Sequence, residues 1–191
     1  MDFPITPEQI CSDLRGEFAG LILIDPIHRG LYSTDASPFQ VQPWAVAIPE
    51  EPSAVSVILR YCHDNHLPIV ARGAGTGLAG ESLGPGLILD LSQHLRRIFR
   101  VDSQTITVEP GVTLAEVNAE LAKIGRRFAP DPASAATCTV GGMIATNASG
   151  GNAYRYGYVR DYVHSLSVVW DSGDRSMISS PRAKDRISAI S

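Results

Sequence analysis

The sequence predicts an α/β fold, within the broader α+β class, built on a small parallel sheet. Residues 45–91 read as strand, helix and strand, followed by a glycine-rich loop and a further strand, which is the order of a βαβ unit with parallel pairing. The chain has 191 residues, of which 44% are hydrophobic and 19% charged, so it can bury a sizeable core. Its glycines gather largely in two segments, which are the candidates for ligand contact.

Residues 1–44 are expected to form a helix followed by an arm. A short helix is predicted within residues 5–18, because Thr6-Pro7 supplies an N-cap and a proline in the first turn and Ile10, Leu14 and Phe18 then share a face. Residues 25–44 carry proline, serine, aspartate and aromatic residues without a period. We expect them to lie over the core as an irregular arm.

The βαβ pattern begins with a short apolar strand at Ala45–Ile48 that Pro49 ends. Apolar residues at helical spacing follow, namely Val55, Ile58, Leu59 and Cys62. The segments 67–71 and 87–91 are nearly continuous in apolar residues, as buried parallel strands are.

The second half of the chain predicts one further helix between strands. An alternating strand is expected at 105–109. Thr113 and Glu116 form a capping box for a helix that Gly125 ends. Leu166, Val168 and Trp170 alternate as a late strand, and Ser172-Gly173 predicts a turn into residues 175–178.

Composition excludes several classes of protein. A net charge of −4 argues against nucleic-acid binding, and no apolar stretch approaches the ~20 residues of a membrane span. Lysine occurs only at positions 123 and 184, so a Gly-Lys-Ser/Thr phosphate loop is absent and a lysine Schiff-base enzyme is not expected. Cys11, Cys62 and Cys138 form no Cys-x-x-Cys pair, so neither a disulfide scaffold nor a zinc site is expected, and we predict a reducing cytoplasm.

The first glycine-rich segment, residues 72–80, contains Gly-x-Gly-x-x-Gly at 75–80, the fingerprint of dinucleotide-binding folds. That fingerprint requires a helix directly after the loop, and the glycines and proline of 81–86 prevent one. We predict instead an anion-binding nest of successive backbone amides, with Thr76 and Arg72 as further donors. The alternative is a turn that only reverses the chain.

The second glycine-rich segment covers residues 139–151. Thr139 is expected to cap a short helix over 140–145, so that Gly141 and Gly142 expose the N–H groups of its first turn to a bound anion. The alternative is tight packing of helix against sheet, which small residues also permit.

Several motifs in one order carry a family resemblance. They are Arg-Gly-Ala-Gly-Thr-Gly-Leu at 72–78, Asp-Pro-Ala-Ser at 131–134, Thr-Val-Gly-Gly-Met-Ile-Ala-Thr-Asn-Ala-Ser-Gly at 139–150, Arg-Tyr-Gly at 155–157 and Asp-Tyr-Val at 161–163. Together they resemble the PCMH-type FAD-binding domain of the FAD-linked oxidases related to vanillyl-alcohol oxidase, in the branch of the D-lactate, glycolate and D-2-hydroxyglutarate dehydrogenases. Asp-Leu-Arg-Gly at 13–16 and Tyr-Ser-Thr-Asp-Ala-Ser at 32–37 are similar to the long bacterial members, which carry an iron–sulfur module.

The resemblance implies a two-lobed FAD-binding domain over residues 45–178. Its first lobe would be the small parallel βαβ unit, about 45–102, and its second lobe a mixed or antiparallel sheet with helices, about 103–178. Residues 1–44 would remain a helix and arm, and 179–191 a loose tail.

The resemblance also implies where FAD binds. Residues 72–78 would wrap its pyrophosphate, and residues 139–147 would close from the other lobe. Thr76 stands where some relatives carry a histidine that bonds covalently to the flavin, which implies non-covalent FAD. The expected cofactor-binding residues are Arg72, Gly73, Ala74, Gly75, Thr76, Gly77, Leu78, Asp131, Ser134, Thr139, Gly141, Gly142, Ala145, Asn147, Gly150, Tyr156 and Gly157.

The implied reaction is hydride transfer from the α-carbon of a D-2-hydroxy acid to flavin N5. The family's segment that completes the flavin domain, its substrate-binding cap and its iron–sulfur cysteines have no counterpart in this sequence. We therefore expect an incomplete domain that is inactive by itself and binds substrate only together with a cap. The alternative is a truncated, non-enzymatic remnant with weak or no FAD binding.

Overall fold

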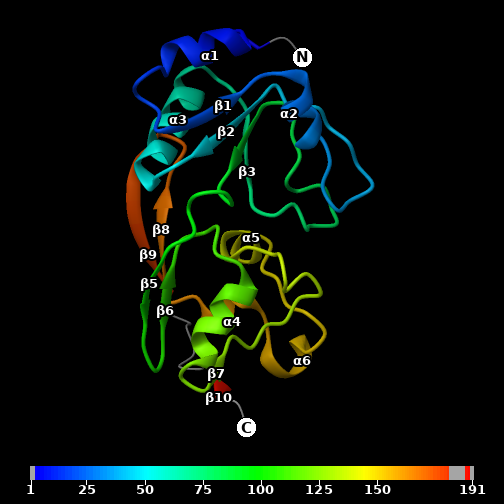
Figure 1. Ribbon diagram of the computed structural model, residues 1–191, viewed down its shortest axis with the longest axis vertical. Helices are drawn as coiled ribbons and strands as arrows, with labels where there is room; N and C mark the ends of the chain where they lie inside the picture. The colour runs from blue at the N-terminus through cyan, green and yellow to red at the C-terminus, as the bar shows by residue number, and fades with distance from the viewer. Residues whose placement is uncertain (1–2, 181–187, 190–191) are drawn as a thin grey trace. The chain divides into compact units, whose positions relative to one another are not determined.

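A computed structural model describes residues 3–180 and 188–189 (Figure 1). Contacts divide the chain into two compact units. The first unit contains the residues up to Leu95 together with 167–176, and the second contains 96–166 and the residues from Met177 onward. The boundaries that we predict for the two lobes and the tail stay predictions.

The first unit begins with helix α1 (Pro7–Asp13), which starts where the sequence predicts. The Thr6 side chain accepts a hydrogen bond of 3.3 Å from the Gln9 amide, and Pro7 lies in the first turn. The helix ends at Asp13, short of the predicted limit. The apolar face nevertheless continues, because Leu14 and Phe18 are buried in the core.

The arm that follows α1 is more regular than predicted. It contains β1 (Gly20–Leu23) and, within the stretch expected to be irregular, helix α2 (Pro26–Leu31). Asp25 caps α2 by accepting hydrogen bonds of 3.1 Å from the amides of Ile27 and His28. The expectation of an irregular arm is therefore wrong at 26–31, where Asp-Pro is a helix-start signal without an apolar period.

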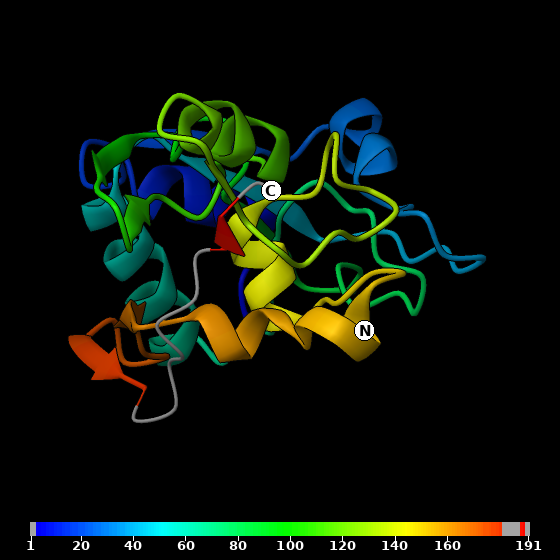
Figure 2. The same cartoon turned by 90° about the horizontal axis from the view of Figure 1, so that it is seen from below.

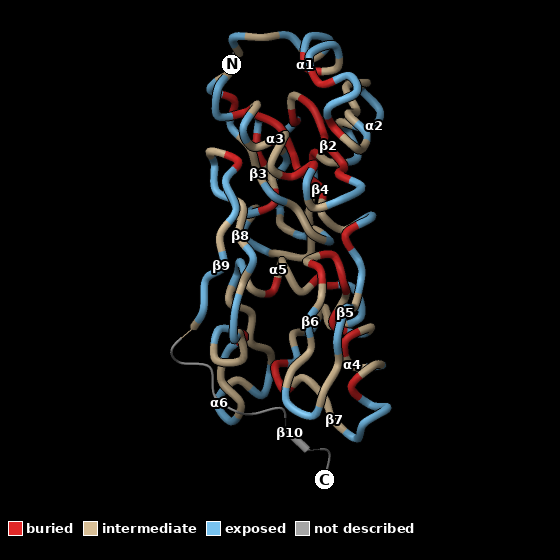
Figure 3. The backbone as a smooth tube through the Cα atoms, turned by 90° about the vertical axis from the view of Figure 1, so that its left-hand side faces the viewer, coloured by how far each residue is buried: buried red, intermediate tan, exposed pale blue. Residues whose placement is uncertain are grey.

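The sheet of the first unit confirms the βαβ prediction. Its further elements are β2 (Ala45–Pro49), α3 (Pro52–Asp64), β3 (Ile69–Arg72) and β4 (Leu87–Asp90). The strand order is β1-β2-β4-β3, in which β4 pairs in parallel with both neighbours and β1 pairs antiparallel with β2. Every residue of β2 and β4 is buried, which explains their continuous apolar sequence (Figure 3).

Alternation along these strands gives the sheet two apolar faces. One face packs with α1 and α3 into the main core, whose strand residues are Ala45, Ala47, Leu87 and Leu89. The opposite face presents Val46, Ile48 and Ile88, against which Tyr32 and Val70 pack. Tyr32 is thereby fixed beside the strands that lead into the first glycine-rich loop.

The second unit contains short elements around two small cores. The helices and strands of this unit between residues 98 and 162 are β5 (Ile98–Val101), β6 (Ile106–Val108), α4 (Leu114–Ala122), β7 (Arg126–Arg127), α5 (Val140–Ala145), α6 (Ala153–Tyr156) and the 3₁₀ helix η1 (Val159–Tyr162). The sequence pattern does not predict β5, β7, α6 or η1. In Figure 2, α5, α6 and η1 follow one another from yellow to orange.

The predicted capping box of the second unit is confirmed. The Glu116 carboxylate accepts from the Thr113 amide at 2.8 Å, and the Glu116 amide donates to Thr113 Oγ1 at 3.2 Å. Strands β5 and β6 form an antiparallel pair before this helix. Buried Leu114, Val117 and Leu121 supply the apolar stripe of α4.

The last predicted strands are confirmed as β8 (Ser165–Val169) and β9 (Arg175–Ser179), which pair with each other. Strand β10 (Ser188–Ala189) pairs antiparallel with β7. The rest of the predicted loose tail, residues 181–187 and 190–191, lies outside the described residues. Within the described ranges, no helix is both long and apolar enough to cross a membrane.

Candidate functional site

The first glycine-rich loop leaves the carboxyl end of a parallel strand. Arg72 is the last residue of β3 and lies opposite Asp90, the last residue of β4. Residues 73–86 then form turns and bends without a helix before β4 begins. The prediction that this loop is not a Rossmann turn is therefore confirmed, and the loop occupies the edge of the sheet where α/β folds bind ligands.

The loop presents unused backbone donors. Within the part of the chain that the structure describes, the amides of residues 73–78 donate no hydrogen bond. Gly75 adopts φ +66°, a left-handed conformation of the kind that occurs in anion-binding nests. Amides left unpaired in this way are suited to an anion, so the loop fits the diphosphate of a dinucleotide.

The guanidinium of Arg72 binds backbone groups of the same chain. It donates to the carbonyl oxygens of Tyr32 at 3.4 Å and Thr34 at 2.9 Å, and it lies 5.3 Å from the centroid of the Tyr32 ring. A Cβ on Gly75 would come within 2.7 Å of the same guanidinium. Arg72 therefore lies between the arm and the loop, close to Gly75, and its contact with a phosphate stays a prediction.

A carboxylate already lies at the far end of the loop. The Glu81 side chain accepts a hydrogen bond of 3.0 Å from the Ala79 amide and covers the position that a Cβ on Gly77 would take. An acidic group accepting from a loop amide supports the prediction of an anion nest. The side chain of Leu78, by contrast, is 75% exposed and makes the loop tip apolar.

At the second predicted anion site, unlike the first, the backbone N–H groups already have hydrogen-bond partners. Thr139 caps α5 as predicted, by accepting from the Gly142 amide at 3.2 Å. The Val140 amide donates to Val112 at 2.8 Å, and the Gly141 amide donates to Pro110 at 2.8 Å. With the Met143 amide bonded to Thr139 as well, the first turn has no N–H group left for a ligand.

The expectation that Gly141 and Gly142 expose free amides is therefore wrong, because the segment 110–112 runs against the start of α5. A Cβ on Gly141 would lie 2.7 Å from the Pro110 side chain. Gly141 therefore permits tight packing, but against Pro110 in the turn after β6 rather than against a sheet. Any contact of these glycines with FAD, which stays a prediction, would have to be made by atoms other than these N–H groups.

The remaining candidates of the second unit form a contiguous region of backbone. The Asp131 amide donates to the Ser149 carbonyl at 3.0 Å, and Asp131 bridges to Gly150, whose φ is +101°. The Ser134 carbonyl accepts from two amides that lead into Thr139, those of Thr137 and Cys138. The structure thus brings 131–134 and 139–150 together within this unit.

Four further candidates follow along the same stretch, with Ala145 exposed in the last turn of α5. Asn147 has φ +49°, and its side chain accepts from the Arg160 amide at 3.1 Å. The Tyr156 ring contacts the guanidinium of Arg155 at 5.2 Å, and Gly157 has φ +79°. These geometries account for Asn147 and Gly157 structurally, and their role toward FAD stays a prediction.

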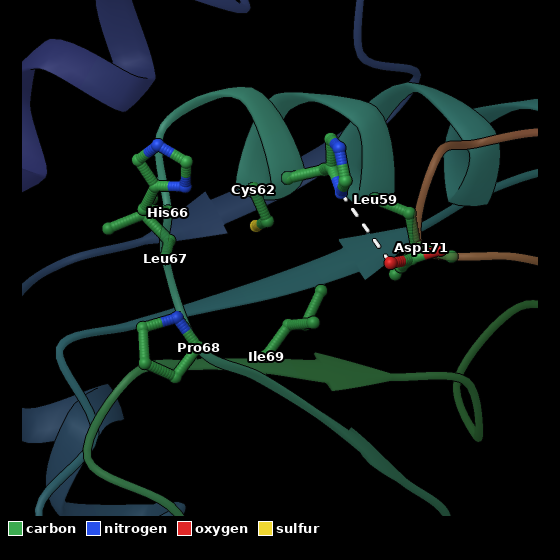
Figure 4. Close-up of a pocket in the computed structure, with 8 residues that line it drawn as sticks. Leu59, Cys62, His66, Leu67, Pro68, Ile69 and Asp171 are labelled. Carbon is green, nitrogen blue, oxygen red and sulfur yellow. Dashed lines mark ion pairs between the residues drawn. The ribbon is translucent and has the colours of Figure 1, made fainter.

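A cavity in the first unit lies apart from the glycine loop. It holds about 390 Å³ and is lined by Leu59, Cys62, His63, His66, Leu67, Pro68, Ile69 and Asp171 (Figure 4). His63 Nδ1 lies 3.5 Å from a carboxylate oxygen of Asp171, which makes an ion pair when the imidazole is protonated. Leu67, Pro68 and Ile69 place the cavity at the start of β3, whereas the glycine loop follows the end of that strand, so the cavity is not counted in the candidate site.

The sequence pattern assigns no site role to residues 32–37 beyond their family-like motif. In the structure they contact the glycine loop through Thr34, Asp35 and Ala36. The one signal for this contact is the Tyr-Ser-Thr-Asp-Ala-Ser motif itself. Residue spacing cannot show that it meets a loop about forty positions later in the chain.

Comparison with known sequences identifies one family. Residues 43–177 match the family described as FAD binding domain. The chain is 38% identical over 162 residues to the glycolate oxidase subunit GlcD of Bacillus subtilis, covering 82% of this chain and 34% of that protein. It is 34% identical over 174 residues to the D-2-hydroxyglutarate dehydrogenase of Pseudomonas putida, covering 88% of this chain and 17% of that protein.

A plant protein and a solved structure extend these similarities. The mitochondrial D-lactate dehydrogenase [cytochrome] of Arabidopsis thaliana is 33% identical over 179 residues, covering 91% of this chain and 31% of that protein. The structure of alkyldihydroxyacetonephosphate synthase superposes with a TM-score of 0.76 at 20% identity, over 95% of this chain and 37% of that one. That likeness establishes the PCMH-type fold. The chain spans about a third or less of the length of these relatives.

Proposed function

The chain belongs to the FAD binding domain family, and from this premise we propose that it holds FAD non-covalently as the flavin-binding part of a D-2-hydroxy-acid dehydrogenase. When bound, the flavin supplies the hydride acceptor for the α-carbon of such an acid. The relatives that support this substrate class are named for glycolate, D-2-hydroxyglutarate and D-lactate.

The free amides of residues 73–78 carry the proposal. They would donate hydrogen bonds to the oxygens of the FAD diphosphate, with Gly75 setting their direction and Arg72 supporting the loop. Thr76, at the position where some relatives carry a flavin-linked histidine, supports non-covalent attachment. In the second unit, the role of residues 131–134 and 139–150 toward FAD stays a prediction.

Substrate recognition and the iron–sulfur module of the proposed enzyme are not assigned to residues of this chain. Substrate recognition would belong to a cap domain, and an iron–sulfur module would be a partner, as the resemblance implies. We also propose a cytoplasmic location, which is supported by three cysteines that are free thiols.

FAD-loaded protein mixed with D-lactate under anaerobic conditions should keep its oxidised flavin spectrum, because this chain alone positions no substrate.

The experiment that tests FAD binding compares two glycines that have nearly the same φ. Gly75 has φ +66° in the loop, and Gly125 has φ +67° after α4, where no neighbouring atom lies within 4 Å of the position that an added Cβ would take. Alanine at either position costs roughly 1–2 kcal/mol of backbone strain. Only Gly75→Ala also disturbs the proposed nest.

We expect the wild-type chain to be yellow after incubation with FAD and gel filtration, with Gly125→Ala retaining its affinity and Gly75→Ala losing at least about tenfold, or 1.4 kcal/mol. Fluorescence titration of FAD gives the dissociation constants. Equal losses in both variants would show that strain alone is responsible. A wild-type chain that remains colourless with FAD would favour the non-enzymatic remnant.

A further inference from the structure

A short segment of the arm contacts the glycine loop along its length. We call residues 32–36 the brace. At the start of the loop, the Arg72 guanidinium donates to the Thr34 carbonyl at 2.9 Å. In the middle of the loop, the Ala36 amide donates to the carbonyl oxygen of Gly75, also at 2.9 Å. The brace therefore fixes the first half of the loop through a loop carbonyl and a side chain, leaving the amides of residues 73–78 unused.

The brace also fixes the point where the loop ends. Ser82, which is buried, donates from its hydroxyl to the Asp35 carboxylate at 2.9 Å. The other oxygen of Asp35 accepts from the Ser37 amide at 2.8 Å, which holds the carboxylate in place. The loop is thus held at both ends by a segment about forty residues earlier in the chain.

The brace is in turn anchored to the sheet through Tyr32. The Tyr32 hydroxyl donates to the Asp90 carboxylate at 2.6 Å, and Asp90 is 2% exposed at the end of β4. The amide and hydroxyl of Ser92 donate to the other oxygen of Asp90 at 2.7 and 2.6 Å. Burial and the bond to Asp90 raise the pKa of Tyr32, so its hydroxyl keeps its proton at neutral pH.

We propose that Tyr32, Asp90 and Asp35 are positioning residues that hold residues 73–78 in their anion-binding shape before FAD arrives. This inference rests on the proposed FAD-binding function. Ordering a glycine-rich loop costs more backbone entropy than ordering other sequences. The brace orders the loop during folding, so FAD binding does not have to supply this entropy cost. Because the binding-competent loop is already populated, more of the contact energy with FAD appears as affinity.

The test uses two tyrosines that make the same kind of bond. Tyr32→Phe keeps the ring beneath Arg72 and removes only the hydroxyl that reaches Asp90. Tyr61→Phe is the matched control, because its hydroxyl donates to Asp13 at 2.7 Å and joins α3 to the end of α1, away from the loop. Both variants are studied in the full chain at a temperature where circular dichroism shows them folded.

Two measurements are made on each variant. Fluorescence titration gives the dissociation constant for FAD, and ¹⁵N relaxation gives the order parameters of the Gly73, Gly75 and Gly77 amides without FAD. We expect Tyr32→Phe to weaken FAD binding about tenfold, corresponding to loss of the ordering of about one residue. The loop order parameters should fall from about 0.85 toward 0.6, while Tyr61→Phe changes neither quantity.

Ser82→Ala removes the contact at the other end of the brace and should act in the same direction, so the test survives if Tyr32→Phe fails to fold. Unchanged affinity and unchanged order parameters in the folded variants would overturn the inference. If the wild-type chain binds no FAD, the proposed function fails. The order parameters then decide separately whether the brace holds the loop.

Discussion

Replacing Gly150 by alanine separates a packing role from a ligand role in the second glycine-rich segment. Gly150 has φ +101°, and an added Cβ would overlap the carbonyl of Asp131 and lie 2.7 Å from the Pro132 nitrogen. These are backbone atoms, so they cannot move aside as a flexible side chain would. The neighbouring Gly151 has no atom within 4 Å of the same position and supplies the control.

The cost of Gly150→Ala has two parts. A side chain in this region of φ costs roughly 1–2 kcal/mol. Separating the two segments also weakens the hydrogen bond from the Asp131 amide to Ser149, which contributes about 1 kcal/mol. The sum of about 2–3 kcal/mol is a large share of the 5–15 kcal/mol that stabilises an ordinary domain.

Urea denaturation followed by circular dichroism measures this loss, and the melting temperature should fall by roughly 5–10 °C for a chain of this size. Gly151→Ala should stay within about 0.5 kcal/mol of the wild type. A Gly150→Ala protein of unchanged stability that has lost FAD affinity would refute the packing argument and make Gly150 a direct cofactor contact.

Three further outcomes are expected. Glu81→Gln removes a carboxylate from the anion nest and should strengthen FAD binding about two- to fivefold at low salt, less at high salt, in a fluorescence titration. The hydrogen bond from the Thr113 amide holds the pKa of Glu116 below its ordinary 4.5, so its contribution to stability is complete above that pH and is lost as the pH falls through the folded-state pKa. Glu116→Gln should therefore flatten the acid side of the pH–stability curve, by less than about 1 kcal/mol because the side chain is 43% exposed. Burial raises the pKa of Cys62 to about 12 and covers its thiol, whereas Cys11 is partly exposed, so a disulfide reagent should modify Cys11 before Cys62 in the folded protein.

The sequence is sufficient to predict a structural feature where that feature depends on a hydrogen bond between residues that are neighbours in the chain. Thr6, Thr113 and Thr139 each cap the helix that the sequence assigns to them. The same kind of signal at Asp25 has no apolar period after it, so the sequence pattern misses α2. The apolar side chains Ile27 and Leu31 of α2 are exposed. Because α2 has no buried face, its sequence shows no apolar stripe.

Distant contacts account for the errors at the candidate site. The sequence pattern predicts free amides in both glycine-rich segments. The amides of 73–78 remain free, whereas those at the start of α5 are taken by Pro110 and Val112, a segment about thirty residues away. The guanidinium of Arg72 binds carbonyl groups of the arm, a contact that the sequence pattern does not predict, and its contact with a phosphate stays a prediction.

The amino-acid sequence alone determined the parallel βαβ unit, the helix caps and the family to which this chain belongs, because apolar periodicity, capping and motif order are properties of neighbouring residues. Only the tertiary structure decided which backbone donors are available to a ligand. Each N–H group can satisfy one strong acceptor, and whether that acceptor is a carbonyl of the same chain depends on which remote segment the fold places against it.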